Sequence, residues 1–183
     1  MPDFLVYSRD APGTAALRDD AALLEEHWSY MDAFAGTMIA RGPTLAADRE
    51  TATGSLHVLG LPSVEAAREF VAHEPNERAG VYAEHSVWRF ENLLGRTMWE
   101  FPGAPGELRF LVIGSGRAVP PERLSTELQE RLILHGALTP LDDAGPGGVA
   151  LAVQARDRGA LGALGLDAFP DAEIHDWELG GRR

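Results

Sequence analysis

Hydrophobic and polar positions in the first half of the chain alternate between the periods of strands and helices. Asp3–Ser8 alternates residue by residue, as a strand does, whereas apolar side chains recur at steps of three and four over residues 19–40, as on one helix face. Glycine and proline separate the segments that follow. The same rules predict strands at Thr44–Asp48 and Ser55–Leu61, a helix over Ser63–Ala72 and a strand over Glu84–Phe90.

The second half repeats this β-α-β-β-α-β order. Phe4-Leu5-Val6 returns as Phe110-Leu111-Val112, and Trp88 returns as Trp177. The glycine- and proline-rich residues 101–107 read as a linker, which predicts one unit over residues 1–100 and a second over 108–183. The elements expected in the second unit are Leu108–Ile113, a helix over Pro121–His135, Leu138–Leu141, Val149–Gln154, a helix from Asp157, and Glu173–Leu179.

The repeated order is that of a ferredoxin-like α+β unit, in which two helices cover one face of a four-stranded antiparallel sheet. One such sheet leaves its other face bare, whereas two sheets can bury these faces against each other. We therefore predict tandem ferredoxin-like units whose sheets pair into an α/β barrel within one chain, an intramolecular pseudo-dimer. A homodimer of the whole chain is the alternative.

Composition excludes several kinds of chemistry. The chain has no cysteine and no lysine, which excludes thiolate nucleophiles, cysteine-bound iron–sulfur clusters and lysine Schiff bases. A net charge of −12 disfavours nucleic acid and anionic membrane surfaces as partners, and no apolar run reaches the roughly 20 residues of a membrane span. No secretory signal pattern is seen at the start. We expect a cytoplasmic protein that acts on a small molecule.

Three polar residues are predicted to converge at one edge of the first sheet. Asp10 ends the first strand, His27 lies on the apolar face of the first helix, and Glu74 follows the second helix. A neighbouring carboxylate would fix the tautomer of the histidine, and the pattern leaves open whether Asp10 or Glu74 does so. The alternative is a purely structural role, in which His27 is buried and donates a hydrogen bond to a backbone carbonyl. The second half has Pro121 and Ala163 at the positions of His27 and Glu74, so only the first half has this set.

The first half resembles the YCII-related family of dimeric α/β-barrel proteins over about residues 3–92. The resemblance implies a His–carboxylate catalytic pair, with an aspartate after the first strand and a histidine in the first helix, matched here by Asp10 and His27. It also implies an Asp-Pro pair after the second helix, where this chain has Glu74-Pro75. The matching segments are Leu5–Asp10, His27, Gly42-Pro43, Gly54-Ser55, Ser63–Ala67, Glu74-Pro75 and Ala79–Tyr82.

These residues predict proton transfer without a cofactor. A histidine oriented by a carboxylate can remove a proton next to a carbonyl and return it elsewhere. The resemblance implies dehydrohalogenation, and related barrels isomerise or cyclise enolisable molecules. We expect a lyase, isomerase or cyclase that acts on an enolisable polyketide-like or aromatic metabolite. Predicted substrate contacts are Trp28, Tyr30, Tyr82 and His57, the last on a strand and facing the barrel interior or solvent, with Trp177 or His175 near the pocket.

Three alternatives remain at the level of sequence. A metal held by His73, Glu74 and His27 is disfavoured, because neither HxH nor HExxH spacing occurs. The same barrel hosts cofactor-free and haem-dependent oxygenases. A non-catalytic ligand-binding protein would use His27 only to hydrogen-bond its ligand.

Overall fold

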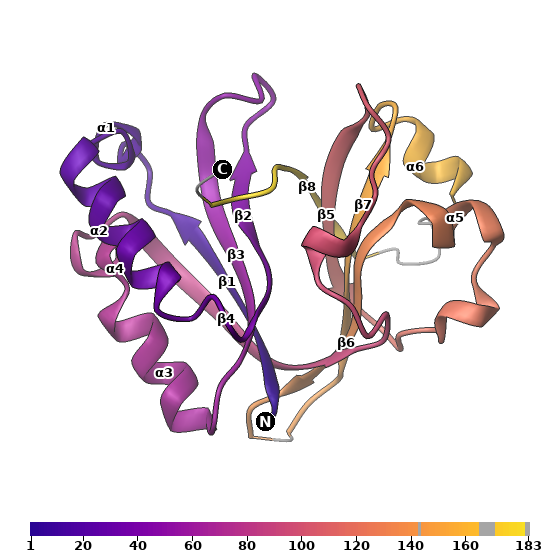
Figure 1. Cartoon of the computed structure of the whole chain (residues 1–183), viewed down its shortest axis with the longest axis horizontal. Helices are drawn as coiled ribbons and strands as arrows, with labels where there is room; N and C mark the ends of the chain where they lie inside the picture. Colours follow the sequence, from indigo (N-terminus) through magenta and orange to yellow (C-terminus); the bar gives the residue numbers. More distant parts are fainter. Residues whose placement is uncertain (143, 165–170, 182–183) are drawn as a thin grey trace.

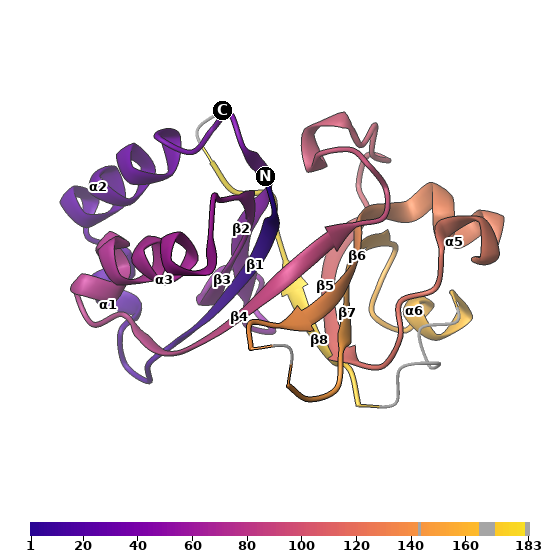
Figure 2. The same cartoon turned by 90° about the horizontal axis from the view of Figure 1, so that it is seen from below.

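Two sheets stand back to back, with helices on both outer sides, in the computed structural model (Figure 1). It describes residues 1–142, 144–164 and 171–181. Figure 2 shows α2 and α3 over the outer face of the first sheet and α5 and α6 on the opposite flank. In the part of the chain described, no helix is long and apolar enough to cross a membrane.

The first half has four strands and four helices. Asp20 caps the second helix by accepting hydrogen bonds from the amides of Ala22 and Leu23, and Ser63 caps the third in the same way, as polar N-cap side chains do. The elements are β1 (Asp3–Asp10), α1 (Ala15–Arg18), α2 (Ala21–Asp32), β2 (Met38–Leu45), β3 (Ala52–Gly60), α3 (Val64–His73), α4 (Pro75–Arg78) and β4 (Tyr82–Asn92).

The second half has the same strand order, with shorter helices among the residues described. The helix expected from Asp157 is described only as the single turn α6, and its continuation falls on residues outside the described ranges. The elements are η1 (Met98–Glu100), β5 (Leu108–Ser115), η2 (Pro121–Arg123), α5 (Thr126–Arg131), β6 (Leu132–Pro140), β7 (Gly148–Ala155), α6 (Ala160–Ala163) and β8 (Glu173–Trp177).

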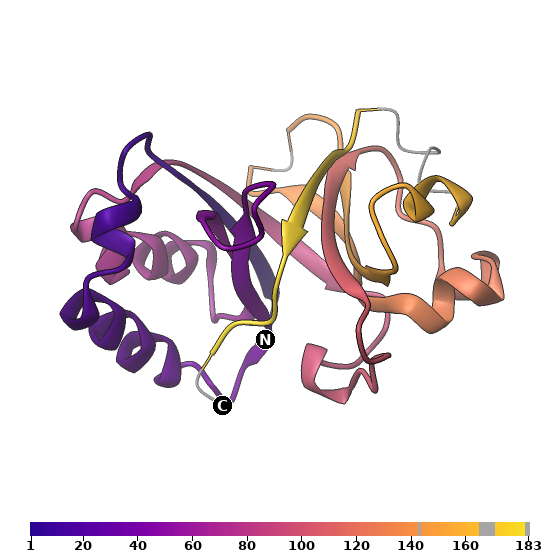
Figure 3. The ribbon, with the colours of Figure 1, turned by 90° about the horizontal axis from the view of Figure 1, so that it is seen from above.

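The strands close into one ring in the order β1-β3-β2-β8-β5-β7-β6-β4. Within each half the order is that of a ferredoxin-like sheet, and antiparallel β2–β8 and β4–β6 pairs join the halves. The predicted α+β architecture, with tandem units paired into a barrel inside one chain, is therefore confirmed. Figure 3 shows β8 running between the two halves.

A shared apolar core fills the barrel. Leu5 and Leu56 from the first half meet Leu111, Leu134 and Trp177 from the second, and all are essentially inaccessible to solvent. Each sheet also buries its outer face under its own helices, as with Phe4, Met31 and Phe70 in the first half. Burial of both faces explains why Phe4–Tyr7 is a continuous hydrophobic run, so the residue-by-residue alternation predicted for Asp3–Ser8 is wrong.

The long first helix predicted over residues 19–40 is wrong at its end. Helix α2 stops at Asp32, and Phe34 keeps its place in the apolar stripe from the following turn by packing against Tyr30 and Phe70. Residues from Met38 onward form β2 instead of the short strand expected at Thr44–Asp48. Pairing with β3 along the strand, joined by β8 at Thr44 and Leu45, satisfies backbone groups of β2 and outweighs the helical period.

The helix predicted over Pro121–His135 is wrong for the same reason. Only Thr126–Arg131 is α-helical, and residues 132–135 begin β6, which the sequence placed at Leu138–Leu141. Four consecutive buried residues at 132–135 fit a strand with both faces covered better than one face of a helix.

A β-bulge interrupts β2 at its start. The register with β3 shifts between Met38 and Ala40, so Ile39 and Ala40 both face the barrel core. The next residue, Arg41, consequently faces the helices. The second half has the corresponding shift between Leu132 and Leu134, which supports the internal repeat.

Candidate active site

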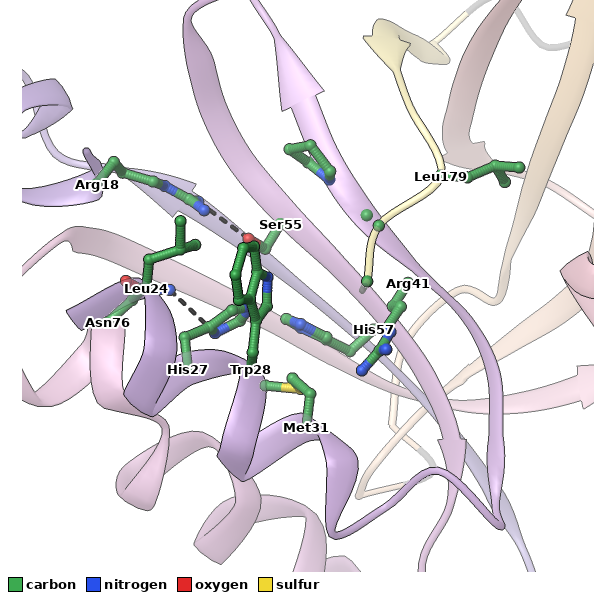
Figure 4. A pocket seen from close by; sticks show the side chains of 14 residues that line it. Arg18, Leu24, His27, Trp28, Met31, Arg41, Ser55, His57, Asn76 and Leu179 are labelled. Carbon is green, nitrogen blue, oxygen red and sulfur yellow. Dashed lines mark hydrogen bonds between the residues drawn. The ribbon is translucent and has the colours of Figure 1, made fainter. Parts of the chain in front are cut away.

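A pocket of about 260 Å³ lies between α2 and the outer face of β2 and β3 (Figure 4). Strands β2 and β3 form its floor, α2 its roof, and a segment after β8 closes one side. It is lined by Arg18, Leu24, His27, Trp28, Met31, Arg41, Gly42, Pro43, Ser55, His57, Asn76, Leu179, Gly180 and Gly181. We call it the helix-side pocket, because it lies outside the barrel core.

His27 and Glu74 form the central pair of this site. The Nδ1 atom of His27 lies 2.5 Å from Oε1 of Glu74, whose side chain is almost completely buried. The other carboxylate oxygen of Glu74 accepts the amide of Glu77 at 3.0 Å and so caps α4. Pro75 restricts Glu74 to an extended backbone, which ends α3 and fixes the carboxylate. Glu74, not Asp10, is therefore the partner of His27.

Asn76 contacts both members of this pair, and Tyr82 contacts Asn76 on the side away from the pocket. The Asn76 amide donates to Oε1 of Glu74 at 3.3 Å and also lies 3.1 Å from Nδ1 of His27. The Tyr82 hydroxyl donates to Ser55 at 3.1 Å. Burial, together with the nearby Glu74, raises the pKa of Tyr82 above its ordinary value, so the phenol stays neutral.

Asp10 contributes through an arginine. Arg18 binds both of its carboxylate oxygens, at 2.8 and 2.7 Å, and also donates to the Ser55 hydroxyl at 2.9 Å. Asp10 thus lies in the same network as His27 but does not contact it among the hydrogen bonds of the described residues. Of the three side chains predicted to converge, His27 and Glu74 are in contact. Asp10 is connected to them through the hydrogen bonds of Arg18, Ser55, Tyr82 and Asn76.

His57 faces the helix layer, so the prediction that it faces the barrel interior or solvent is wrong. Its ring centroid lies 5.8 Å from that of His27, and its side chain lines the helix-side pocket. Burial, followed by the nearby His27, Arg18 and Arg41, lowers the pKa of His57 well below its ordinary value. The ring is therefore neutral.

Arg41 pairs directly with His57 across the β2–β3 ladder. Side chains of directly paired residues lie on the same face of a sheet, so both point into the helix-side pocket. Nη2 of Arg41 lies 3.7 Å from Oδ1 of Asp32, whereas Nε and Nη1 are buried and have no hydrogen-bond partner in the described part of the chain.

The second half closes the pocket through the segment after β8. The amide of Gly180 donates to the carbonyl of Arg41 at 2.9 Å. This approach requires glycine in β2, because a Cβ on Gly42 would lie 1.9 Å from the carbonyl oxygen of Glu178. The segment Leu179–Gly181 therefore lies directly against the pocket.

Residues 3–91 match the model of the YCII-related domain. A 5-chloro-2-hydroxyhydroquinone dehydrochlorinase from Burkholderia phenoliruptrix AC1100, solved with 2,5-dihydroxybenzoquinone, is 30% identical over 49% of this chain and 94% of its own, with a TM-score of 0.45. The chain belongs to the YCII-related family. This confirms the resemblance derived from sequence.

Two more distant structures resemble the whole YCII-related chain. A chlorite dismutase candidate is 10% identical over 97% of this chain and 95% of its own, with a TM-score of 0.55. A monooxygenase candidate from Lactobacillus acidophilus NCFM is 8% identical over 97% and 93%, with a TM-score of 0.51. At these identities both show the dimeric α/β-barrel fold alone. No curated protein matches the chain.

The predicted substrate contacts of the YCII-related half separate into two groups. Trp28 and His57 line the helix-side pocket. Tyr30 does not, because its hydroxyl donates to the carbonyl of Phe70 at 2.9 Å and its ring packs between the helices. Tyr82 lies one layer behind the pocket wall, against Ser55.

Neither Trp177 nor His175 lines this pocket, but Trp177 lies near it as expected, because its Nε1 atom would be 3.0 Å from a Cβ on the lining residue Gly42. Trp177 lies in the barrel core, and Nδ1 of His175 is 3.4 Å from the hydroxyl of Tyr7. His73 lies at the exposed end of α3, where its ring binds the carbonyl of Glu69. Within the described ranges, no group of three or more ligating side chains is arranged to hold a metal ion.

Four polar residues of the pocket were missed from the sequence. Ser55 shares a strand face with His57 at a spacing of two, and strand alternation could have found it. Asn76 follows the Glu74-Pro75 pair closely. Arg18 lies in a single turn of helix without a pattern, and Arg41 depends on the bulge in β2.

Proposed function

We propose that the protein is a cofactor-independent lyase or isomerase in which His27 moves a proton on an enolisable small molecule. The observation that carries this proposal is the geometry of His27: Nδ1 is held by the buried Glu74, and the ring lines the helix-side pocket. No hydrogen bond among the described residues occupies Nε2 of His27.

The contact with Glu74 determines which nitrogen of His27 acts on the substrate. The Glu74 carboxylate accepts a hydrogen bond from Nδ1–H, which leaves the lone pair on Nε2 for the substrate. Nε2 removes a proton from the carbon beside a carbonyl or enol, and Glu74 stabilises the imidazolium that forms. The imidazolium then returns the proton to a departing group, in an elimination, or to another atom, in an isomerisation, conjugate addition or cyclisation.

The size of the pocket favours a single substituted ring. A protein cavity of about 150 Å³ holds one benzene molecule, and this pocket has about 260 Å³. Leu24, Trp28 and Met31 supply an apolar wall, while polar groups lie on the opposite side. Loss of hydrogen chloride from a hydroxylated ring, the reaction for which the Burkholderia enzyme is named, is one elimination of this class.

The proposal is tested by mass spectrometry in D₂O with 5-chloro-2-hydroxyhydroquinone and simple cyclic ketones. The native protein should release chloride or incorporate deuterium, and His27→Ala should reduce the rate by about 10²–10⁴-fold. Glu74→Gln should also slow the reaction, because a neutral amide stabilises the imidazolium less well. His73→Ala, at the exposed end of α3, is the matched control and should keep the native rate.

Circular dichroism and thermal melts establish that the variants are folded. Native-like turnover by a folded His27→Ala protein would refute the proposed role. Binding of these compounds without exchange or elimination in the native protein would instead support the ligand-binding alternative.

A further inference from the structure

Arg41 carries the least satisfied charge in the helix-side pocket. Its side chain is 12% exposed, and Nε and Nη1 are buried with no partner among the residues described. A buried ionic donor without a partner is costly, by more than the 1–3 kcal/mol or so of a neutral group. The guanidinium therefore has unused capacity to bind an acceptor.

The other charges of the pocket are already matched. Asp10 holds Arg18 with two hydrogen bonds, and Glu74 holds His27. Among the residues described, the carboxylate that the Arg41 guanidinium approaches is that of the half-exposed Asp32, at 3.7 Å. The ladder partner His57 is neutral and supplies no negative charge. The pocket thus has an excess positive charge on the β2 side of its floor.

The C-terminal segment restricts where an acceptor can approach. A Cβ on Gly181 would lie 2.4 Å from Nη2 of Arg41, so the main chain packs closely against that part of the guanidinium. The carbonyl of Arg41 is bound by Gly180. Figure 4 shows Arg41 beside His57 at the edge of the pocket, on the opposite side from Arg18.

We propose that Arg41 binds an anionic oxygen of the substrate, either an ionised enol or phenol or a carboxylate, so that the substrate class is a small oxyanionic ring. That this anion belongs to a substrate rests on the proposed function. An enolate oxygen beside Arg41 would gain charge as His27 removes the proton, and a fixed guanidinium in a desolvated site stabilises such charge strongly.

The test compares matched anionic and neutral probes by calorimetry at pH 7. Benzoate is compared with benzamide, and 2,5-dihydroxybenzoquinone with its dimethyl ether. We expect the native protein to bind at least one anion about tenfold or more tightly than its neutral partner, and Arg41→Gln to abolish this preference, as for a lost hydrogen bond to a charged group. Arg41→Lys should retain part of it.

Arg68→Gln is the matched control, because Arg68 is exposed on α3 and distant from the pocket. It should keep the native preference. The inference is overturned if neither anion is preferred by the native protein up to millimolar concentration, or if a folded Arg41→Gln protein keeps the native preference.

Proton transfer by His27 and anion binding by Arg41 can be refuted independently of each other. The His27→Ala variant lacks the proposed base but keeps Arg41, so it should retain the preference for the anion. Anion preference without deuterium exchange in the native protein would refute the proposed function alone. Exchange without anion preference would refute the role of Arg41 alone.

Discussion

Glu74 fixes the geometry of the candidate active site because each of its carboxylate oxygens binds a different element. One caps α4 through the amide of Glu77, and the other holds His27. The family resemblance implies aspartate here, and the extra methylene of glutamate still allows both bonds. The sequence indicated that Glu74 and His27 lie at the same edge of the sheet, through the Glu-Pro step and the apolar spacing of His27. It left open whether Asp10 or Glu74 is the partner of His27, which the 2.5 Å contact decides. Asp10 was placed correctly at the strand end, but its actual partner, Arg18, has no such signal.

Burial of His57 should make stability depend on pH. The folded protein holds this ring neutral, whereas the unfolded chain protonates it below an ordinary pKa of about 6.5. The unfolded state then binds more protons, so the free energy of unfolding falls as the pH drops from about 7 to 5. His135 and His175, whose pKa values burial also lowers, act in the same direction.

The prediction is checked by urea unfolding at pH 7 and pH 5. His57→Gln should lose about 1–2 kcal/mol less than the native protein over this interval, because one depressed histidine has been removed. His73→Gln should behave as the native protein. Identical pH slopes for native and His57→Gln proteins would contradict the assignment of His57 as a buried neutral ring.

Strand β2 shows how one extra residue determines which face a side chain occupies. Without the bulge after Met38, strict alternation would turn Arg41 toward the barrel core. With the bulge, Arg41 pairs with His57 on the helix side. The helical period of residues 19–40 masked this strand, and a bulge has no reliable sequence signature. The sequence therefore predicted the order of the elements but not the register that places Arg41.

Because β2 approaches the segment after β8 closely, we expect any side chain at position 42 to destabilise the folded protein. In Gly42→Ala, the new Cβ would meet backbone atoms of Glu178 and Gly180 that cannot rotate away. We expect a loss of about 1–3 kcal/mol in the free energy of unfolding, the usual range for overpacking.

Gly36→Ala is the control for this substitution, because nothing lies within 4 Å of the position its Cβ would take. Its stability in urea should remain close to that of the native protein. Equal stability of the Gly42→Ala and native proteins would show that the two segments are not held as closely as described.

At the scale of the whole molecule, both halves contribute residues to the candidate site, but the polar side chains come from the first half. The first supplies His27, Glu74 and Arg41, and the second supplies the wall formed by Leu179–Gly181. Duplication of short motifs such as Phe4-Leu5-Val6 was enough to predict the paired sheets. The sequence indicated that the second half walls the pocket but not which residues do so, because they depend on the β2–β8 pairing across the pseudo-dimer, and Leu179 was assigned to the last strand.

Removal of this wall should affect binding more than stability. A protein that ends at Glu178 keeps every strand of the ring but loses the Gly180 hydrogen bond to Arg41. We expect a thermal midpoint within a few degrees of the native value and about three- to tenfold weaker binding of benzoate, as for one lost hydrogen bond. A protein that ends at Gly181 is the control, and equal benzoate binding by the two would contradict this role.

The β2–β8 pair also determines the order in which the site can form. Thr44 is bonded to a strand that contains Trp177, so this contact must wait for a very long loop to close. His27 and Glu74 are brought together by α2, α3 and α4, which all belong to the first half. The pocket, in contrast, is completed only when β8, a strand synthesised near the end of the chain, pairs with β2 and brings Leu179–Gly181 against it.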